Sequence, residues 1–434
     1  MSMRVVYLTA GAGGMYCGSC LRDNALAAAL IRQGRDVLLW PVYSPIRTDD
    51  QDVSASRVVF GGINVYLQHR WRFARRLPKA LTRWLDHPAL LRWAMRGAGS
   101  TDPKLAADLM TTLLMAEEGP HAREMDALID HLRDASPAIV HLPNAFFVGL
   151  ARRIRSALNV PVVCTLTGED ILLDKLDAGA RDRVLTLLRE RAVDVDGFLS
   201  VSNHYTAYAL ANFGVAPDRV RHVPLGVAWD DGAAAEAPPR EGTFTIGYLA
   251  RICPEKGLHN LIEAFEHLVE EGRDCRLLVA GYLGEGDKAY FQTLERRVAK
   301  SAARERVSFL GELDRSQKFA FLRRLDVLSV PTEYEEAKGL YVLEAMSQGV
   351  PVVQPSHGSF PELIESTGGG ILHEPNNPVA LADGLRRMMD DHDLRARLGT
   401  SARKSIREKH TDERMAAAAW AAFEAVVAER AGGA

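Results

Sequence analysis

Cysteine, net charge and long apolar runs are all scarce in this sequence of 434 residues. Its five cysteines are odd in number and scattered, which is typical of reduced thiols rather than of a disulfide framework. Lys and Arg number 53 against 56 Asp and Glu, and the net charge of -3 argues against a general nucleic-acid-binding protein. No stretch approaches the roughly 18 uninterrupted apolar residues of a membrane-spanning helix. The chain runs into a strand from Arg4 without a leader pattern, so we expect a cytoplasmic protein.

Apolar residues make up 47% and charged residues 25%, as in globular proteins, and the length fits two domains of roughly 200 residues. Short apolar strands alternate with helical segments, which favours parallel sheets covered on both faces. The sequence therefore predicts an α/β protein with two doubly wound Rossmann-like domains facing a central cleft. We expect domains at 1–228 and 243–410, a polar linker at 229–242, and a closing helix at 411–434 that packs back on the first domain. The strands are expected at 4–9, 36–41, 138–142, 160–164, 197–201, 244–249, 276–280, 307–310, 327–330 and 351–354.

The first pattern with chemical content follows the strand at 244–249. Arg251 and Lys256 lie five residues apart, where a strand ends and a helix begins. A guanidinium and an ammonium there can converge on a phosphate, with the amides of the helix start as further donors. Taken alone, such a pair is more often a pair of surface charges.

A second pattern follows the strand at 327–330. Glu336 and Glu344 are eight residues apart, about two helical turns, so both carboxylates can face the same way. Glu336 is expected in the loop before the helix and Glu344 within it. A carboxylate buried among apolar neighbours needs hydrogen-bonding partners, and the hydroxyl groups of a ribose or a hexose are suitable. The alternative is a solvated pair of charges on a helix.

Together these residues resemble the retaining nucleotide-sugar glycosyltransferases of the GT-B fold, specifically glycosyltransferase family 4 (group 1). The resemblance covers most of residues 197–400 closely and the first 195 more loosely. It rests on the segments 224–227, 247–258, 336–344, 349–353, 358–363 and 370–372.

The resemblance implies a role for each matching position. Arg251 and Lys256 match the pair that holds the donor diphosphate, Glu336 the carboxylate near the donor sugar, and Glu344 the one that receives the ribose hydroxyls. In this family backbone amides surround the sugar and phosphate at the positions of Lys338, Gly339 and Leu340, although Lys338 replaces a commoner aromatic residue. Fixed cations and amides stabilise the charge that develops on a departing diphosphate. No metal cluster is evident in the sequence, so we expect metal-independent catalysis and no cofactor.

A glycine-rich turn joins the first strand to the first helix. Gly13 and Gly14 let the backbone approach a phosphate or sugar closely, and in the family this loop faces the donor. The turn lacks the full G-x-G-x-x-G pattern, and no acidic residue ends the second strand, which argues against a nicotinamide site.

Cys17 and Cys20 form a CxxC motif at the expected start of the first helix. Three interpretations stay open: structural or cleft-lining cysteines, a redox dithiol at a helix start that favours the thiolate, and a metal site.

The chain departs from the family at Thr167, where members commonly carry a histidine that contacts the donor sugar. Threonine forms hydrogen bonds but does not titrate near neutrality.

Glu169 and Asp170 either offer a carboxylate to the acceptor hydroxyl or form an acidic pair at a helix start. His141, at another strand end, either lines the cleft or is a packed core histidine. The turn at Gly61 is either part of the acceptor side or a plain hairpin turn.

Residues 70–96 are basic and rich in tryptophan. They form either a solvated helical excursion that caps the cleft or a peripheral contact with an anionic membrane or lipid acceptor.

The sequence therefore predicts an enzyme that moves a sugar from a nucleotide diphosphate-sugar to a hydroxyl of a glycan, lipid or small-molecule acceptor, with retention of configuration. Two alternatives remain open, a nucleotide-sugar epimerase on the same fold and a non-catalytic nucleotide-sugar-binding protein.

Overall fold

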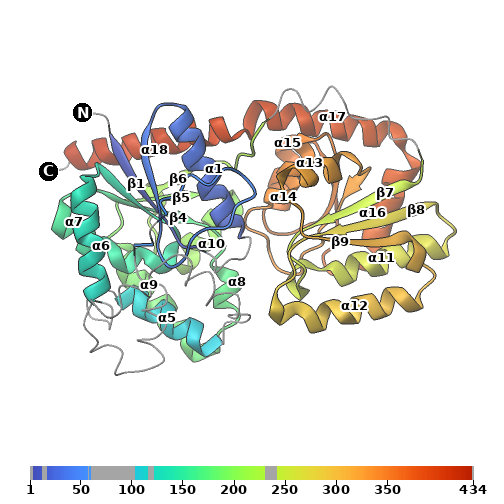
Figure 1. Ribbon diagram of the computed structural model, residues 1–434, viewed down its shortest axis with the longest axis horizontal. Helices are drawn as coiled ribbons and strands as arrows, with labels where there is room; N and C mark the ends of the chain where they lie inside the picture. Colours follow the sequence, from blue (N-terminus) through green and yellow to red (C-terminus); the bar gives the residue numbers. More distant parts are fainter. Residues whose placement is uncertain are drawn as a thin grey trace. The chain divides into compact units, whose positions relative to one another are not determined.

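The computed structural model describes residues 3–11, 17–56, 58–59, 103–115, 122–229 and 242–432. The chain forms two compact units: Met1–Pro224 with Glu413–Ala434 (unit 1), and Leu225–Asp412 (unit 2). Each is built on a parallel sheet of six strands with helices packed on it, so the predicted pair of doubly wound α/β domains is confirmed (Figure 1). Gly13, Gly14, Gly61, the segment 70–96 and most of the expected linker at 229–242 lie outside the described residues.

The sheet of unit 1 has the order β2-β1-β3-β4-β5-β6. Its strands run where short apolar stretches predict them, with two exceptions. Strand β4 begins and ends two residues later than expected, and β6 is a short edge strand that the sequence does not signal. The bounds are β1 (Arg4–Thr9), β2 (Asp36–Pro41), β3 (Ile139–Leu142), β4 (Val162–Leu166), β5 (Gly197–Ser200) and β6 (Val220–His222).

Two helices of unit 1 bury apolar side chains together against this sheet. The C-terminal helix α18 (Asp412–Gly432) contributes Met415, Trp420 and Phe423 to the same core as α1 (Gly18–Arg32). The Ala-rich face of α18 permits this close packing, because small side chains let the backbone approach the sheet. The remaining helices are α5 (Pro103–Met115), α6 (Ala122–Ala135), η3 (Ala145–Leu150), α7 (Ala151–Leu158), α8 (Asp170–Leu173), α9 (Ala178–Ala192), α10 (Asn203–Asn212) and η4 (Pro217–Arg219).

The sheet of unit 2 has the order β12-β11-β10-β7-β8-β9. Strand β10 is two residues shorter than expected, and β12 is a strand where the sequence showed only a family motif. The bounds are β7 (Phe244–Leu249), β8 (Cys275–Ala280), β9 (Val307–Gly311), β10 (Val327–Leu328), β11 (Val352–Pro355) and β12 (Gly370–His373).

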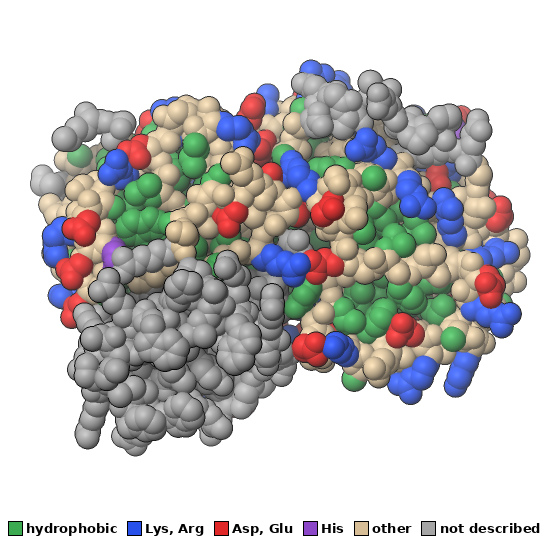
Figure 2. All heavy atoms as spheres, in the orientation of Figure 1, with side chains coloured by type: hydrophobic (Ala, Val, Ile, Leu, Met, Phe, Trp, Pro, Cys, Tyr) green, Lys and Arg blue, Asp and Glu red, His purple; other side chains and the backbone are tan. Residues whose placement is uncertain are grey.

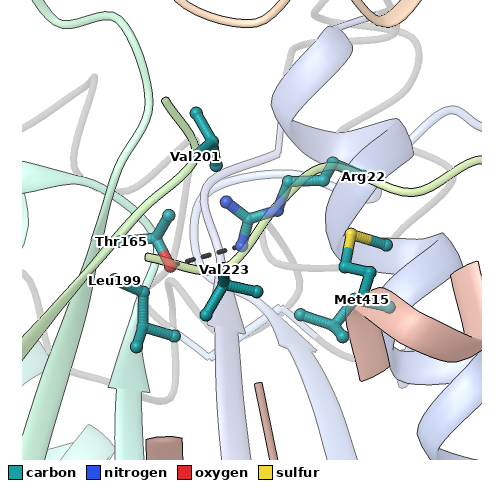
Figure 3. Close-up of a pocket in the computed structure, with 7 residues that line it drawn as sticks. Arg22, Thr165, Leu199, Val201, Val223 and Met415 are labelled. Carbon is teal, nitrogen blue, oxygen red and sulfur yellow. Dashed lines mark hydrogen bonds between the residues drawn. The ribbon is translucent and has the colours of Figure 1, made fainter. Parts of the chain in front are cut away.

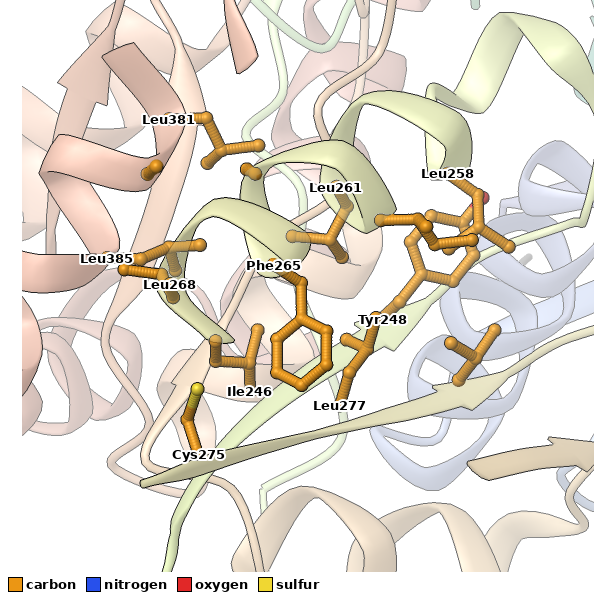
Figure 4. Close-up of a cluster of buried hydrophobic side chains, with 14 of the residues drawn as sticks. Ile246, Tyr248, Leu258, Leu261, Phe265, Leu268, Cys275, Leu277, Leu381 and Leu385 are labelled. Carbon is orange, nitrogen blue, oxygen red and sulfur yellow. The ribbon is translucent and has the colours of Figure 1, made fainter. Parts of the chain in front are cut away.

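The core of unit 2 is assembled chiefly by α11 (Leu258–Glu270), whose residues Leu261, Phe265 and Leu268 are fully buried. Figure 4 shows these side chains against β7 and β8, with Leu381 and Leu385 of α16 (Pro378–Asp390) beside them. The other helices are η6 (Pro254–Lys256), η7 (Glu285–Asp287), α12 (Lys288–Lys300), η8 (Arg304–Arg306), α13 (Arg315–Arg323), α14 (Leu340–Ser347), α15 (Phe360–Thr367) and α17 (His392–Lys409).

Two distant segments of the chain pair at one end of unit 2. The Val227 amide donates to the carbonyl of His410, and the amide of Asp412 donates to the carbonyl of Val227, at 2.9 and 3.0 Å. A Cβ on Gly226 would lie 2.2 Å from the carbonyl oxygen of Thr411, so only glycine permits this approach.

The strand orders locate the place where a ligand is expected. In unit 2 the order reverses between β7 and β10, and in unit 1 between β1 and β3. In open parallel sheets, ligands bind outside the carboxyl ends of the strands at such a switch point. In unit 2 this point is flanked by the loops after Leu249 and after Leu328.

Among the described residues, no helix is both long enough and apolar enough to cross a membrane.

Gly257 permits the contact between the two loops at the switch point of unit 2. It has φ +67°, and an added Cβ would lie 1.8 Å from the carbonyl oxygen of Pro331. We expect Gly257→Ala to lower the free energy of unfolding by about 3 kcal/mol, because the left-handed strain adds to a backbone clash. Gly272 is the matched control, because its φ is +77° but no atom lies within 4 Å of an added Cβ. Gly272→Ala should lower the free energy of unfolding by only about 1 kcal/mol. Urea titrations of both variants and the wild type measure these losses; equal losses would contradict the role of the close approach.

Candidate active site

The loops at the switch point of unit 2 bring together residues that are far apart in the sequence. The turn at 250–257 follows β7, and the loop at 329–339 follows β10. The Glu333 amide donates to the carbonyl of Glu255 at 3.0 Å, which joins the two loops next to the Gly257 contact. Lys256 and Glu336 therefore reach the same place from different strands.

Lys256 and Glu336 form the central interaction of the site. The Lys256 Nζ lies 2.5 Å from Glu336 Oε2, and the two side chains are 16% and 5% exposed. The Glu336 carboxylate also accepts a hydrogen bond of 3.2 Å from the Lys338 amide. An ammonium and a carboxylate are thus held in contact in a largely buried position.

Burial by itself would raise the pKa of Glu336, because a low-dielectric surrounding disfavours the charged form. The adjacent Lys256 ammonium outweighs burial, with Lys338 and the Tyr334 hydroxyl adding to its effect, and the pKa falls to about 2. Glu336 is therefore a carboxylate at any physiological pH.

Two tyrosines that the sequence did not single out complete this arrangement. The hydroxyls of Tyr334 and Tyr341 donate to Glu336 Oε2 at 2.7 and 3.3 Å. The Lys256 Nζ lies 4.9 and 5.1 Å from the centroids of the same two rings, within the range of a cation–π contact. Burial, followed by the Glu336 charge, raises the pKa of both hydroxyls well above the ordinary value. Both tyrosines lie within five residues of Glu336, which is the one sequence signal that pointed to them.

Arg251 occupies the same turn but has other partners. Its Nε donates to the Cys253 sulfur at 3.3 Å, and its carbonyl accepts from the Tyr248 hydroxyl at 3.0 Å. Burial opposes the guanidinium charge, but Cys253, Glu255 and other neighbours keep the pKa of Arg251 above its ordinary value. Arg251 is thus a fixed cation at the carboxyl end of β7.

Glu344 lies within α14, as expected, but pairs with a residue that the sequence analysis missed. Lys318 of α13 places its Nζ 2.5 Å from Glu344 Oε1, and the side chains are 10% and 15% exposed. No spacing rule connects a lysine of one helix with a glutamate 26 residues later on another, so this pair was not predictable. The two glutamates of the motif are therefore each paired with a lysine, on different elements.

The start of α14 lies directly after Glu336. Gly339 is the N-terminal cap of α14 with φ +66°, Leu340 is its first residue, and the Lys338 amide already donates to Glu336. The first-turn amides of a helix have no intrahelical acceptor and attract anions. Lys338, Gly339 and Leu340 thus follow Glu336 in the sequence and lie at the start of α14.

In unit 1 the two members of the acidic pair after β4 have different surroundings. Glu169 accepts hydrogen bonds from the amides of Ala145, Thr167 and Gly168 at 2.8 to 3.0 Å, so it braces this loop. Burial, followed by the neighbouring Glu169 charge, raises the pKa of Asp170 to about 6. Glu169 and Asp170 thus differ, because Glu169 is held by three backbone amides and Asp170 has a raised pKa.

His141 is a core residue. It is fully buried, its ring stacks on Tyr7 at a centroid distance of 3.7 Å, and its Nε2 lies 2.6 Å from the Thr165 hydroxyl. Burial, followed by the Arg22 charge, lowers the pKa of His141 well below its ordinary value. Figure 3 shows Arg22 extending from α1 to the same Thr165, with a hydrogen bond of 3.2 Å. Of the two interpretations of His141, the structure favours packing.

Charge on the surface of unit 2 is mixed. On the described part of the face shown in Figure 2, basic and acidic side chains are interspersed. This described part of the face therefore shows no broad positive field that would attract an anion. Within the described ranges, no three or more His, Cys, Asp or Glu side chains are grouped as metal ligands.

Removal of the Lys256 charge tests the electrostatics of the site. In the wild type the folded-state pKa of Glu336, about 2, lies below the ordinary 4.5, so the pair contributes fully above about pH 4.5 and is lost as the pH falls toward 2. We expect Lys256→Met to lower the free energy of unfolding by about 3 kcal/mol near pH 7, because it leaves a buried carboxylate unpaired. Near pH 4 the loss should shrink, since without Lys256 burial raises the pKa of Glu336, and in the folded variant this carboxylate then takes up a proton. Urea titrations at both pH values measure this, with exposed Lys404→Met as the control; a pH-independent loss would be inconsistent with the ion pair.

Two protein-family models match this chain, one over each of its two parts. The family described as "Glycosyl transferases group 1" matches residues 233–405, and "Glycosyltransferase Family 4" matches residues 109–230. Among curated proteins, the chain is 30% identical over 205 residues to a 2-deoxystreptamine glucosyltransferase of Streptomyces kanamyceticus, covering 45% of this chain and 51% of that one. It is 31% identical over 218 residues to a D-inositol 3-phosphate glycosyltransferase of Xylanimonas cellulosilytica, covering 47% and 51%. The chain thus spans about half the length of these relatives.

Solved structures share the fold at low sequence identity. Sucrose-phosphate synthase from Thermosynechococcus elongatus has a TM-score of 0.73 at 16% identity, covering 98% of this chain and 100% of that one. Anabaena Alr3699/HepE in complex with UDP has a TM-score of 0.67 at 15% identity, covering 98% and 100%. The two family models match most of the chain, and the structure has two six-stranded parallel sheets with Glu336 and Glu344 eight residues apart after β10. The chain belongs to the group 1 glycosyltransferases, glycosyltransferase family 4.

Proposed function

We propose that this protein transfers a sugar from a nucleotide diphosphate-sugar to an acceptor hydroxyl, with retention of configuration and without a metal ion. The observation that carries the proposal is the buried Lys256–Glu336 pair, 2.5 Å apart, at the switch point of unit 2. It offers a cation to a diphosphate and a carboxylate to sugar hydroxyls at one place.

The chemistry follows from where charge develops. As the bond between the sugar and the diphosphate breaks, negative charge accumulates on the leaving group. Lys256 and Arg251 are cations fixed by their surroundings, so they stabilise this charge without reorganising. They supply the positive charge that a divalent metal ion supplies in other enzymes. For retention, the acceptor hydroxyl attacks from the side on which the diphosphate departs, and a phosphate oxygen takes its proton.

Donor binding is proposed to use both glutamates. Glu336 would accept hydrogen bonds from hydroxyl groups of the sugar, and Glu344 from those of the ribose. The amides of Gly339 and Leu340 would donate to the sugar and phosphate. Among solved structures of this fold, Alr3699/HepE has been described in complex with UDP and with UDP-glucose. UDP-sugars are therefore the first donors to test.

The acceptor is proposed to bind unit 1, with Asp170 as the carboxylate available to a hydroxyl group. The names of two relatives refer to 2-deoxystreptamine and D-inositol 3-phosphate, both small polyhydroxylated molecules. A small-molecule polyol is accordingly the preferred acceptor, with glycans and lipids as further candidates.

Turnover with labelled donors tests the proposal. We expect the full chain to transfer sugar from a UDP-, GDP- or ADP-sugar to a polyol panel, in the presence of EDTA and with the anomeric configuration kept. Lys256→Ala should lower kcat/KM by at least about 100-fold, because it removes leaving-group stabilisation. Lys404→Met, an exposed change, should leave turnover unchanged. Epimerised donor without transfer would favour the epimerase, and donor binding without any turnover would favour a non-catalytic binding protein.

Lys318 is expected to act through Glu344. Its contact with Oε1 orients the carboxylate toward the ribose hydroxyls, so Lys318→Met should weaken donor binding more than it slows the chemical step. We expect the donor KM to rise about tenfold with kcat within about twofold of the wild type. Initial rates against donor concentration measure this, and Lys318→Arg should restore much of the affinity. A fall in kcat at unchanged KM would contradict a positioning role.

A further inference from the structure

The CxxC motif at the start of α1 has no role in the proposed transfer reaction. Cys17 is the N-terminal cap of α1, with extended backbone dihedrals of -123° and 125°, and is partly exposed. Cys20 lies three residues later in the first turn and is 1% exposed. Residues three apart on a helix are neighbours on its surface, and the two thiols are hydrogen-bonded to each other. One accessible and one buried sulfur are therefore in contact.

The start of α1 favours the reactive form of Cys17. The amides at the beginning of a helix and its positive dipole end stabilise a thiolate, which is the nucleophile in thiol–disulfide exchange. The first turn of α1 contains no acidic residue that would offset this effect. Cys17 thus has both the exposure and the surroundings of an attacking thiol.

Cys20 has a route for its proton. The Thr9 hydroxyl lies next to the Cys20 thiol, whose pKa it lowers, and donates to Asp23 Oδ2 at 2.9 Å. Asp23 is 1% exposed, accepts from the Tyr7 hydroxyl at 3.0 Å and pairs with Arg22 at 3.2 Å. Burial raises the pKa of Asp23 above its ordinary value, although Arg22 and both hydroxyls counteract the rise, so the carboxylate is a stronger base than an exposed one. The thiol, the hydroxyl and the carboxylate form a chain from Cys20 into the core of unit 1.

We propose that Cys17 and Cys20 form a thiol–disulfide exchange site, which closes reversibly to an intramolecular disulfide with low-molecular-weight disulfides such as glutathione disulfide. The Cys17 thiolate attacks the small disulfide, forms a mixed disulfide and expels one thiolate. The Cys20 sulfur, whose proton passes through Thr9 to Asp23, then attacks the Cys17 sulfur and expels the second. Two protein thiols are oxidised and one disulfide is reduced. The Cys17 proton is lost to solvent when its thiolate forms, the Cys20 proton passes from Asp23 to solvent, and the two released thiolates take up two protons from solvent.

The other cysteines lack this combination. Cys164, Cys253 and Cys275 are buried and separated in the sequence, and burial raises the pKa of each thiol above its ordinary value. No group of three metal-ligating side chains is present among the described residues around the motif or elsewhere, so a dithiol fits the motif better than a metal site. Exchange is therefore expected at Cys17 and Cys20 alone.

Redox titration of the full chain tests the proposal without reference to sugar transfer. Reduced protein is equilibrated in glutathione buffers of increasing oxidised fraction, alkylated with N-ethylmaleimide and digested with trypsin. Both cysteines lie on one tryptic peptide, residues 5–22, which should lose both alkylation sites together and regain them after dithiothreitol. Cys164→Ser should behave as the wild type. A peptide that stays fully alkylated in the most oxidising buffer, or equal oxidation at the other cysteines, would overturn the proposal.

Three variants examine the individual steps. Cys20→Ser should trap a mixed disulfide with glutathione on Cys17, whereas Cys17→Ser should leave Cys20 unmodified because it is buried. Thr9→Val, which keeps the side-chain shape, should slow closure at least about tenfold, because it breaks the proton route; circular dichroism checks that it is folded. Closure at the wild-type rate would remove the relay from the proposal. Stoichiometric Zn²⁺ that protects both thiols from alkylation would replace the exchange site with a metal site.

Discussion

A single buried ion pair organises the candidate active site. A carboxylate that is 5% exposed is stable only when charges and donors surround it, and Glu336 obtains them from Lys256, two tyrosine hydroxyls and an amide. The same arrangement holds the Lys256 ammonium between two aromatic rings. Neither member of the pair can be buried in this way without the other, so the two loops that carry them depend on each other.

Backbone geometry at the switch point makes this pairing possible. Gly257 lets the loop after β7 approach the carbonyl of Pro331. Gly358 lets the backbone approach the loop that carries Glu336, because an added Cβ would lie 2.5 Å from the Glu336 amide nitrogen. Both glycines have positive φ, at +67° and +59°. The loops are thereby held at the carboxyl ends of adjacent parallel strands, where α/β sheets bind their ligands. Rigid placement of the charges is what leaving-group stabilisation requires.

Unit 1 contains a second polar network with a different purpose. Arg22, Asp23, Tyr7 and Thr165 form a connected set of hydrogen bonds within the core, joining α1 to β1 and β4. Such a network is stable because its charges are paired, and it fixes α1, whose first turn carries the dithiol. Helix α1 is therefore fixed in the core of unit 1 and begins at a partly exposed thiol, Cys17.

The sequence by itself determined the doubly wound fold class, most of the strands, and the positions of Arg251, Lys256, Glu336 and Glu344 in loops and helix. Alternating short apolar strands and helical segments, and a fixed spacing of charged residues after two strands, are local patterns and can be read from sequence. Only the tertiary structure decided which partners these residues have in the protein: Tyr334 and Tyr341 at Glu336, Lys318 at Glu344, and Cys253 at Arg251. It also assigned Glu169 to loop bracing and His141 to the core. Side-chain partners depend on the order of strands in the sheet and on helix packing, which bring together residues such as Lys256 and Glu336, 80 positions apart, and leave no local signal.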